Sequence, residues 1–165
     1  MRVITYLILC ACFTVACRPE QTSITCNTEI VSASYKEYLL SKEGDLLIGA
    51  KFRTKEESRS GDYSLKLSNE NPYGYTVKLK DLKDKILNVS VWKKGKGEII
   101  VASDKTRVFY ESFRQIVAQS DGWEKLVASF AFPDNIGDDE LKIYVYHTNN
   151  SPSYFDDFEI NISDK

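Results

Sequence analysis

Aromatic and polar side chains alternate with aliphatic ones in several segments of this 165-residue chain. Asn88 and Trp92 take the opposite phase to the aliphatic residues around them, and Tyr144 and Tyr146 do the same further along. Trp123 opens a similar segment. Flat rings interleaved with amide, hydroxyl and ammonium groups are the side chains that a sugar-binding face requires. We predict a ligand-binding set made of Trp92, Tyr144, Tyr146, Asn88 and Trp123.

These aromatic residues have a second interpretation. Loops such as residues 104–122 are long enough to cover one face of a sheet, and the rings would then form a minor core. An exposed aromatic patch would favour ligand binding instead, because monomeric proteins seldom leave large apolar patches uncovered. Both interpretations stay open at the level of sequence.

Oxygen-bearing side chains form a second candidate site. The alternation of the last predicted strand points Asp156 inward, and a buried carboxylate is costly unless it is paired or bound to a metal. Asp157, Glu29 and the turn at Ser60 could complete a site for Ca²⁺, which binds six to eight oxygens. In the alternative interpretation, Asp156 accepts backbone N–H groups at a turn and Asp157 faces water.

The sequence offers little for catalysis. His147 is the single histidine, and there is no Gly-x-Ser-x-Gly or His-Glu-x-x-His motif. Glu111, Glu124 and the acidic run at 138–140 could supply paired carboxylates for glycoside hydrolysis, but acidic residues in turns are usually only solvated. We therefore expect that the chain is not an enzyme.

From residue 45 onward the dominant hydrophobic period is two, which is typical of half-buried strands. About nine short strands separated by turn residues predict an all-β, antiparallel β-sandwich of the jelly-roll type. Residues 29–40 could form a turn of helix or irregular edge structure. The predicted strands are 46–53, 62–68, 74–80, 85–93, 97–103, 106–111, 123–132, 140–148 and 153–162.

The N-terminal residues differ from the rest. Arg2 precedes an uncharged apolar run of signal-peptide length, which is too short to span a bilayer. The run ends in residues 14–17 (TVAC), a pattern similar to the lipobox of Bacteroidetes-type lipoproteins, in which the cysteine is acylated. We predict lipidation of Cys17. The predicted division is a lipoprotein signal peptide at 1–16, a tether at 17–25 and a β-sandwich domain at 26–165.

Two alternatives to this N-terminus stay open. Cys12 also follows a lipobox-like residue, but its hydrophobic run would be short, and a plain secretory signal would leave the cysteines incidental. With Cys17 acylated, Cys26 is predicted to be a free, buried thiol, whereas acylation of Cys12 would permit a disulfide between Cys17 and Cys26. Several acyl chains would hold the protein firmly on a membrane of the cell envelope.

Charge excludes one class of partner. The chain has 22 Lys and Arg against 24 Asp and Glu, and both signs are interspersed without a basic stripe, so we expect no nucleic-acid binding. We expect a monomer.

Four segments resemble the ordered landmarks of galactose-binding-like jelly rolls, a group that includes many carbohydrate-binding modules. They are residues 60–67 (SGDYSLKL), 121–126 (DGWEKL), 141–146 (LKIYVY) and 154–160 (YFDDFEI). The resemblance implies a structural calcium ion held by Glu29, Ser60 and Asp156 or Asp157. It also implies a glycan as the ligand.

Two functions follow from these observations. The first is a surface or periplasmic lipoprotein that carries a non-catalytic carbohydrate-binding module. The second is a structural or interaction lipoprotein whose sandwich docks another envelope protein, because one fold serves many roles.

Overall fold

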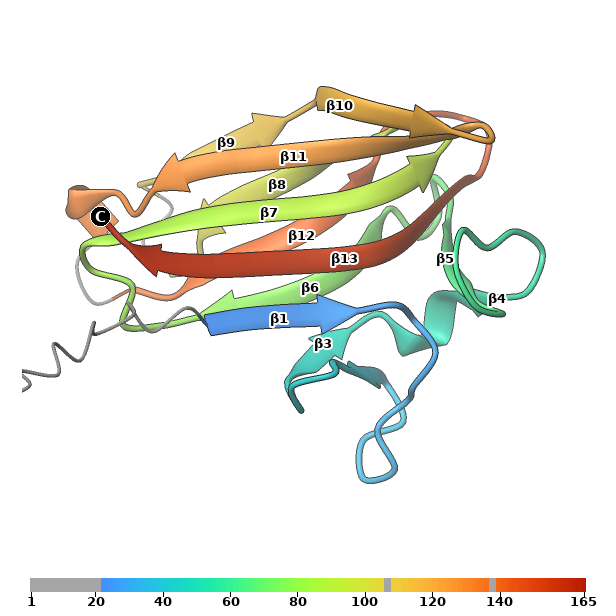
Figure 1. Cartoon of the computed structure of the whole chain (residues 1–165), viewed down its shortest axis with the longest axis horizontal. Helices are drawn as coiled ribbons and strands as arrows, with labels where there is room; N and C mark the ends of the chain where they lie inside the picture. The colour runs from blue at the N-terminus through green and yellow to red at the C-terminus, as the bar shows by residue number, and fades with distance from the viewer. Residues whose placement is uncertain (1–21, 106–107, 137–138) are drawn as a thin grey trace, which may run out of the picture.

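The computed structural model describes residues 22–105, 108–136 and 139–165. These residues form thirteen strands and two short 3₁₀ helices (Figure 1). The strands are β1 (Thr22–Cys26), β2 (Tyr38–Leu40), β3 (Leu46–Ile48), β4 (Arg53–Thr54), β5 (Ser64–Leu67), β6 (Tyr73–Leu79), β7 (Lys85–Lys94), β8 (Gly97–Ser103), β9 (Tyr110–Phe113), β10 (Gln115–Ser120), β11 (Trp123–Ala131), β12 (Leu141–His147) and β13 (Ser153–Asp164). The helices are η1 (Ala50–Phe52) and η2 (Asp134–Ile136).

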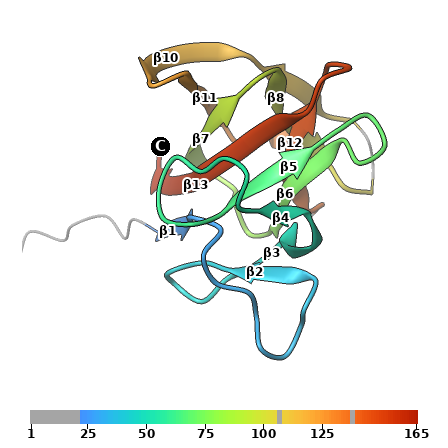
Figure 2. The same ribbon diagram turned by 90° about the vertical axis from the view of Figure 1, so that its right-hand side faces the viewer.

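The strands form two antiparallel sheets that pack face to face. The seven-stranded sheet has the order β10-β11-β7-β13-β5-β4, with β1 also paired to β13, and it lies nearer the viewer in Figure 1. The six-stranded sheet has the order β2-β3-β6-β12-β8-β9 and lies behind it. Figure 2 shows the short strands β1 to β4 gathered on the side away from β10. The predicted antiparallel sandwich is confirmed, with thirteen strands in the described residues in place of about nine.

Alternation explains why the long strands form. In β12 every second side chain from Leu141 to His147 is buried, and the side chains between them are half-exposed. β7 shows the same pattern from Leu87 to Lys93. Apolar side chains on the inner faces of both sheets therefore meet in one core, whose burial provides the main free-energy gain on folding.

The predicted strand 46–53 divides into β3, η1 and β4. Gly49 ends the first of these with φ at 147°, a conformation that an L-residue in a strand does not adopt. A Cβ atom at Gly49 would also lie 3.2 Å from Leu65 Cδ1. The chain consequently turns there and passes from the six-stranded sheet to the seven-stranded sheet.

Three strands lie outside the predicted set. β1 pairs with β13 from Thr22 to Cys26, so residues 22–25 belong to the sheet and the predicted tether is shorter by that length. β2 lies in the segment predicted as helical or irregular, and every residue of β10 is exposed, which leaves no alternation to detect. Cys26 is free and buried, and burial raises its pKa to about 11.

The predicted signal peptide, Cys12 and Cys17 lie outside the described residues. Within the described part of the chain, no helix is long and apolar enough to cross a bilayer.

One ion pair sits on the inner face of the seven-stranded sheet. Lys93 and Glu124 are directly opposite each other on β7 and β11, and Lys93 is only 4% exposed. The Lys93 ammonium donates hydrogen bonds to the Glu124 carboxylate and, at 2.9 Å, to the Gly95 carbonyl. The hydrogen bond from Lys93 holds the pKa of Glu124 below its usual value. Loss of the carboxylate would leave a buried cation with one partner.

We expect Glu124→Gln to lower the free energy of unfolding by about 1–3 kcal/mol, as judged by urea denaturation, because the buried Lys93 ammonium loses its charged partner. In the wild type this contribution is present above the pKa of the unfolded glutamate and is lost as the pH falls through the lowered folded pKa. Glu57→Gln is the control, since its 2.8 Å pair with Lys94 is more exposed and should contribute under about 1 kcal/mol. Equal losses in both variants would contradict the expectation.

Candidate functional site

Besides Tyr38 of the edge strand β2, the outer face of the six-stranded sheet carries four tyrosines. Tyr144 and Tyr146 come from the central strand β12, Tyr73 from the start of β6 and Tyr110 from the start of β9. We call these four residues the tyrosine face. Tyr144 and Tyr146 lie outward because the alternate residues of β12 are buried in the core.

Strand register places the tyrosines in rows across the sheet. Tyr144 lies opposite Thr76 of β6 and Ile100 of β8, and Tyr146 lies opposite Glu98 of β8. Ile100 and Glu98 point outward, yet Ile100 is fully buried and Glu98 is 5% exposed. The tyrosine rings therefore lie over this face and cover the smaller side chains between them.

The rings form a connected aromatic surface. The Tyr73 ring centroid lies 5.6 Å from that of Tyr144 and 5.3 Å from that of Tyr146, in tilted arrangements. Distances of this size are typical of favourable aromatic pairs. Tyr73 and Tyr110 are more than half exposed, so the surface is open to a ligand at both sides.

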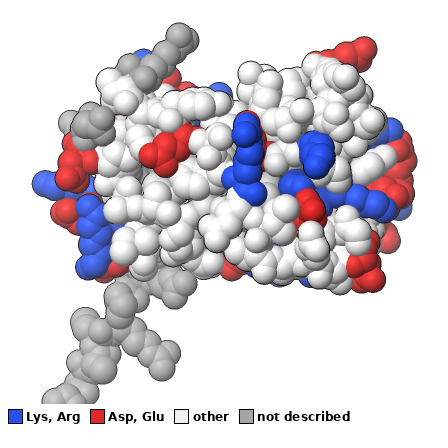
Figure 3. All heavy atoms as spheres, turned by 90° about the horizontal axis from the view of Figure 1, so that it is seen from above, with Lys and Arg blue, Asp and Glu red and all other residues white. Residues whose placement is uncertain are grey.

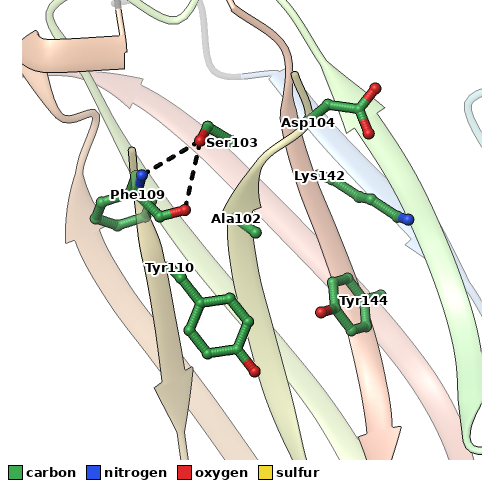
Figure 4. Close-up of a pocket in the computed structure, with 7 residues that line it drawn as sticks. All are labelled: Ala102, Ser103, Asp104, Phe109, Tyr110, Lys142 and Tyr144. Atoms are coloured by element: carbon green, nitrogen blue, oxygen red, sulfur yellow. Dashed lines mark hydrogen bonds between the residues drawn. The ribbon is translucent and has the colours of Figure 1, made fainter. Parts of the chain in front are cut away.

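A hollow of about 290 Å³ opens beside Tyr144. Its floor is Ala102 of β8, which lies opposite Lys142 of β12 and Tyr110 of β9. Figure 4 shows the rings of Tyr110 and Tyr144 on the strands that flank Ala102, with Lys142 and Asp104 toward one end. The small alanine side chain leaves space between the two rings. The lining residues are Ala102, Ser103, Asp104, Phe109, Tyr110, Lys142 and Tyr144.

The hollow has both apolar and hydrogen-bonding groups. Burial raises the pKa of Tyr144 to about 12, so its hydroxyl stays neutral and can donate a hydrogen bond. The Lys142 ammonium lies 5.4 Å from the Tyr144 ring centroid, within the range of a cation–π contact. Asp104 accepts a 2.6 Å hydrogen bond from Lys78. The arrangement suits a ligand that has a flat apolar face and polar groups around its edge.

The structure does not bring the predicted ligand-binding residues together. Trp92 and Asn88 lie on the outer face of the seven-stranded sheet, whereas Tyr144 and Tyr146 lie on the opposite outer face of the sandwich. The Arg59 guanidinium lies 3.7 Å from the Trp92 ring centroid and covers one side of that ring. Asn88 accepts a 2.7 Å hydrogen bond from the Ser129 hydroxyl. Sequence alternation places a residue outward but does not say on which sheet.

Trp123 is 4% exposed and therefore packs inside the protein. It begins β11. It lies beside the loop that contains Arg59 and also beside the turn at Asp121 and Gly122. A ring so covered cannot stack on a ligand without rearrangement. Among the predicted aromatics, Trp123 occupies the covered position that a packing residue would take.

The four predicted calcium ligands lie around the loop at residues 58–63, on the same side of the molecule as Trp92 and Trp123. Asp156 is fully buried and accepts hydrogen bonds from the backbone N–H groups of Arg59 at 2.9 Å and Ser60 at 3.1 Å. Asp157 accepts hydrogen bonds from the Arg59 guanidinium at 2.7 Å and from the Ser60 hydroxyl at 2.6 Å. Glu29 accepts the backbone N–H groups of residues 62 and 63, both at 2.9 Å. Burial raises the pKa of Asp156 to about 6.

As arranged, the carboxylate oxygens of Asp156 and Asp157 are occupied by hydrogen-bond donors. Both oxygens of Asp156 and both of Asp157 accept N–H or O–H donors, since Asp156 Oδ1 also accepts the N–H of Asp157 at 2.8 Å. Across the described ranges, no group of three or more His, Cys, Asp or Glu side chains has a metal-binding arrangement. The Arg59 guanidinium balances the charge of Asp157, whereas Asp156 accepts hydrogen bonds from neutral backbone N–H groups. Calcium binding stays a prediction from sequence.

Three residues of the hollow and face had weak signals in the sequence. Tyr73 belongs to a segment with turn residues, and Tyr110 belongs to a predicted strand without clear alternation. Ala102 is significant only because it is small and stands between two rings, which local sequence cannot show. Strand register brings all three together.

No protein-family model and no curated protein matches this sequence. Solved structures do match it. The first CBM22 xylan-binding domain of Paenibacillus barcinonensis Xyn10C has a TM-score of 0.54 and 15% identity, over 86% of this chain and 96% of that domain. The second CBM22 xylan-binding domain of the same protein has a TM-score of 0.52 and 15% identity, over 86% of this chain and 98% of that domain. A further CBM22 xylan-binding domain has a TM-score of 0.53 and 13% identity, over 85% of this chain and 93% of that domain.

The chain has the fold of the CBM22 xylan-binding domains. At these identities the similarity establishes the fold alone, and it confirms the predicted antiparallel sandwich of the jelly-roll type. In this CBM22-like fold, the tyrosine face is one outer surface of the sandwich.

Chelation tests the calcium prediction. Because the hydrogen-bonded cluster is satisfied without an ion, we expect the melting temperature to be the same in excess EDTA as in millimolar calcium, by thermal scans of the full-length protein. An ion bound only by the native state must raise the melting temperature. A clear fall on chelation would show that the loop at residues 58–63 rearranges around calcium, as the sequence resemblance implies.

Proposed function

We propose that this chain is a non-catalytic carbohydrate-binding lipoprotein of the cell envelope, and that its glycan binds on the tyrosine face. The observation that carries the proposal is the hollow floored by Ala102 between the rings of Tyr110 and Tyr144. The fold shared with CBM22 domains supports it. Tyrosines at outward positions are not needed to fill the core between the sheets, and the exposed rings of Tyr73 and Tyr110 leave the face open to a ligand.

The chemistry of the face matches a sugar chain. The C–H faces of pyranose rings would stack on Tyr110 and Tyr144, and the hydroxyls would exchange hydrogen bonds with the tyrosine O–H groups. The face crosses five strands from Ile48 of β3 to β9, a width of about 19 Å at normal strand spacing. An oligosaccharide segment, rather than one sugar, would fill that width.

The environment of Glu124 and Glu140 supports a non-catalytic role. Glycoside hydrolysis requires one carboxyl group that stays protonated near neutral pH. Hydrogen bonds from lysines lower the pKa of both Glu124, paired with Lys93, and Glu140, paired with Lys80. His147 is buried, and its Nδ1 lies 3.1 Å from the Ser153 hydroxyl. These groups are suited to stability and not to proton transfer.

Lipid anchoring at Cys17 is part of the proposal and rests on the sequence. β1 begins at Thr22, so four residues would separate the acylated cysteine from the sheet. Five Cα–Cα steps join Cys17 to Thr22, and they span at most about 18 Å. The domain would then lie close to the membrane surface, and we expect a monomer there.

Replacing Cys17 with serine should abolish acylation and release the domain in soluble form, because the buried acyl chains provide the membrane affinity. Fractionation of cells, together with metabolic labelling by a fatty acid, measures the change. Cys12→Ser is the matched control and should leave anchoring intact. Membrane partitioning that survives in Cys17→Ser and disappears in Cys12→Ser would identify Cys12 as the anchor.

A second function, docking of another envelope protein, is favoured by one feature. β10 is an edge strand whose residues are all exposed, with Ile116 43% and Val117 52% exposed and no charged residue from 115 to 120. Unprotected edges can pair with a strand from another chain. Figure 3 shows a largely uncharged surface on the side of β9 and β10. Binding of a protein there would leave the tyrosine face free.

Two variants test glycan binding on the tyrosine face. Tyr144→Ala removes a stacking ring, and Ala102→Leu fills the hollow without removing any contact. We expect each to weaken retention on the polysaccharide that binds the wild type, by about three- to tenfold, because one aromatic stacking contact contributes about 0.5–1.5 kcal/mol.

Two substitutions serve as matched controls. Tyr154→Ala changes a half-exposed tyrosine of the seven-stranded sheet, and Ala118→Leu changes an exposed alanine of β10. Neither should alter retention. Binding assays on insoluble polysaccharides and a glycan array supply the measurement, with urea denaturation as the check on folding. Folded Tyr144→Ala and Ala102→Leu proteins that bind like the wild type would rule out this face and favour the protein-docking function.

A further inference from the structure

Lys142 is the cation of the hollow that has no acidic partner. Its side chain lies on the outer face of β12 between Tyr144 and the end of the strand, and it lines the hollow with Tyr110 and Asp104. Its Nζ lies 5.4 Å from the Tyr144 ring centroid. Within the described residues, no Asp or Glu forms an ion pair with Lys142.

The neighbouring cations are paired. Lys78 lies directly opposite Lys142 on β6, and its ammonium is 2.6 Å from the Asp104 carboxylate. Lys80 is 2.8 Å from the Glu140 carboxylate. The cluster of Lys78, Lys80, Lys142, Asp104 and Glu140 thus has three ammonium groups and two carboxylates. Its local charge is about +1, in a chain whose formal net charge is −2. The charge that stays unbalanced belongs to Lys142, the cation nearest the stacking ring.

The other polar groups of the hollow would accept an anion. The Asp104 carboxylate is already neutralised by Lys78, and it is mostly buried. Because burial raises the pKa of Tyr144 to about 12, the Tyr144 hydroxyl stays protonated and does not repel negative charge. A sugar that stacks on Tyr144 would bring its ring substituents close to the Lys142 ammonium.

We propose that the ligand is an acidic glycan and that Lys142 binds a carboxylate on the sugar that stacks on Tyr144. Uronic acids have this chemistry, since they combine the C–H face of a pyranose with a carboxylate at its edge. An ammonium is a compact charge with three donors, so it can follow the carboxylate in more than one orientation. The proposal rests on glycan binding at the tyrosine face and specifies the class of glycan.

The test compares two forms of one polymer. Binding of the full-length protein to a uronic-acid-substituted xylan is measured beside binding to the same xylan after chemical reduction of its carboxyl groups. We expect the acidic form to bind about fivefold tighter at low salt, the upper range for an exposed ion pair. The preference should shrink at high salt because the pair is accessible to solvent.

Three variants assign the preference to one residue. Lys142→Met keeps the length and apolar stem of the side chain but removes the charge, so it should bind both polymers equally, at the wild-type affinity for the reduced form. Lys142→Arg should retain the preference. Lys125→Met removes a lysine from the opposite outer face, beside Trp92, and should leave the preference unchanged.

The outcomes separate this inference from the proposed function. Equal wild-type binding to the acidic and reduced polymers, or a preference that survives in Lys142→Met, would overturn the role of Lys142 and leave glycan binding intact. If Lys142→Met loses the preference for the acidic polymer and keeps full binding to the reduced polymer, the role of Lys142 is supported. No binding to any polysaccharide on a glycan array would overturn glycan binding itself.

Discussion

Strand β13 pairs with β7 along most of its length and with β1 and β5 on its other edge, and the seven-stranded sheet depends on it. A bulge between Asp156 and Glu159 divides it. Phe155 and Phe158 are three positions apart, and a regular strand would place them on opposite faces. The bulge, with Asp157 at φ 49°, lets both enter the core, where Phe158 stacks on Tyr75 at 5.2 Å between ring centroids.

The bulge also explains the acidic cluster. Asp156 lies opposite Trp92 in the register and is buried under the loop, where its carboxylate accepts the N–H groups of Arg59 and Ser60. Gly61 lies against Glu29 so closely that a Cβ atom there would clash with the carboxylate, so this loop is held from two sides. The cluster is therefore one structural unit that fixes a long loop to the last strand. The same loop places Arg59 over Trp92 and closes that ring from one side.

The two outer faces of the sandwich differ for this reason. On the seven-stranded sheet, a loop covers Trp92, and outward positions further along the sheet carry short polar side chains such as Asn88 and Ser129. On the six-stranded sheet no comparable described loop lies over β12, so Tyr144 and Tyr146 cover only their own neighbours in the sheet. A single small residue, Ala102, then decides where a hollow can form.

Alternation along the chain was sufficient to predict the long strands, the sandwich class and the outward phase of Tyr144, Tyr146 and Trp92, because period two is a local property. It could not show β10, which has no buried position, or Gly49 as the end of a strand. The grouping of outward residues depends on which sheet each strand joins, and strand pairing is non-local. Only the tertiary structure therefore separated Trp92 from Tyr144, buried Trp123, and brought Tyr110 and Ala102 beside Lys142.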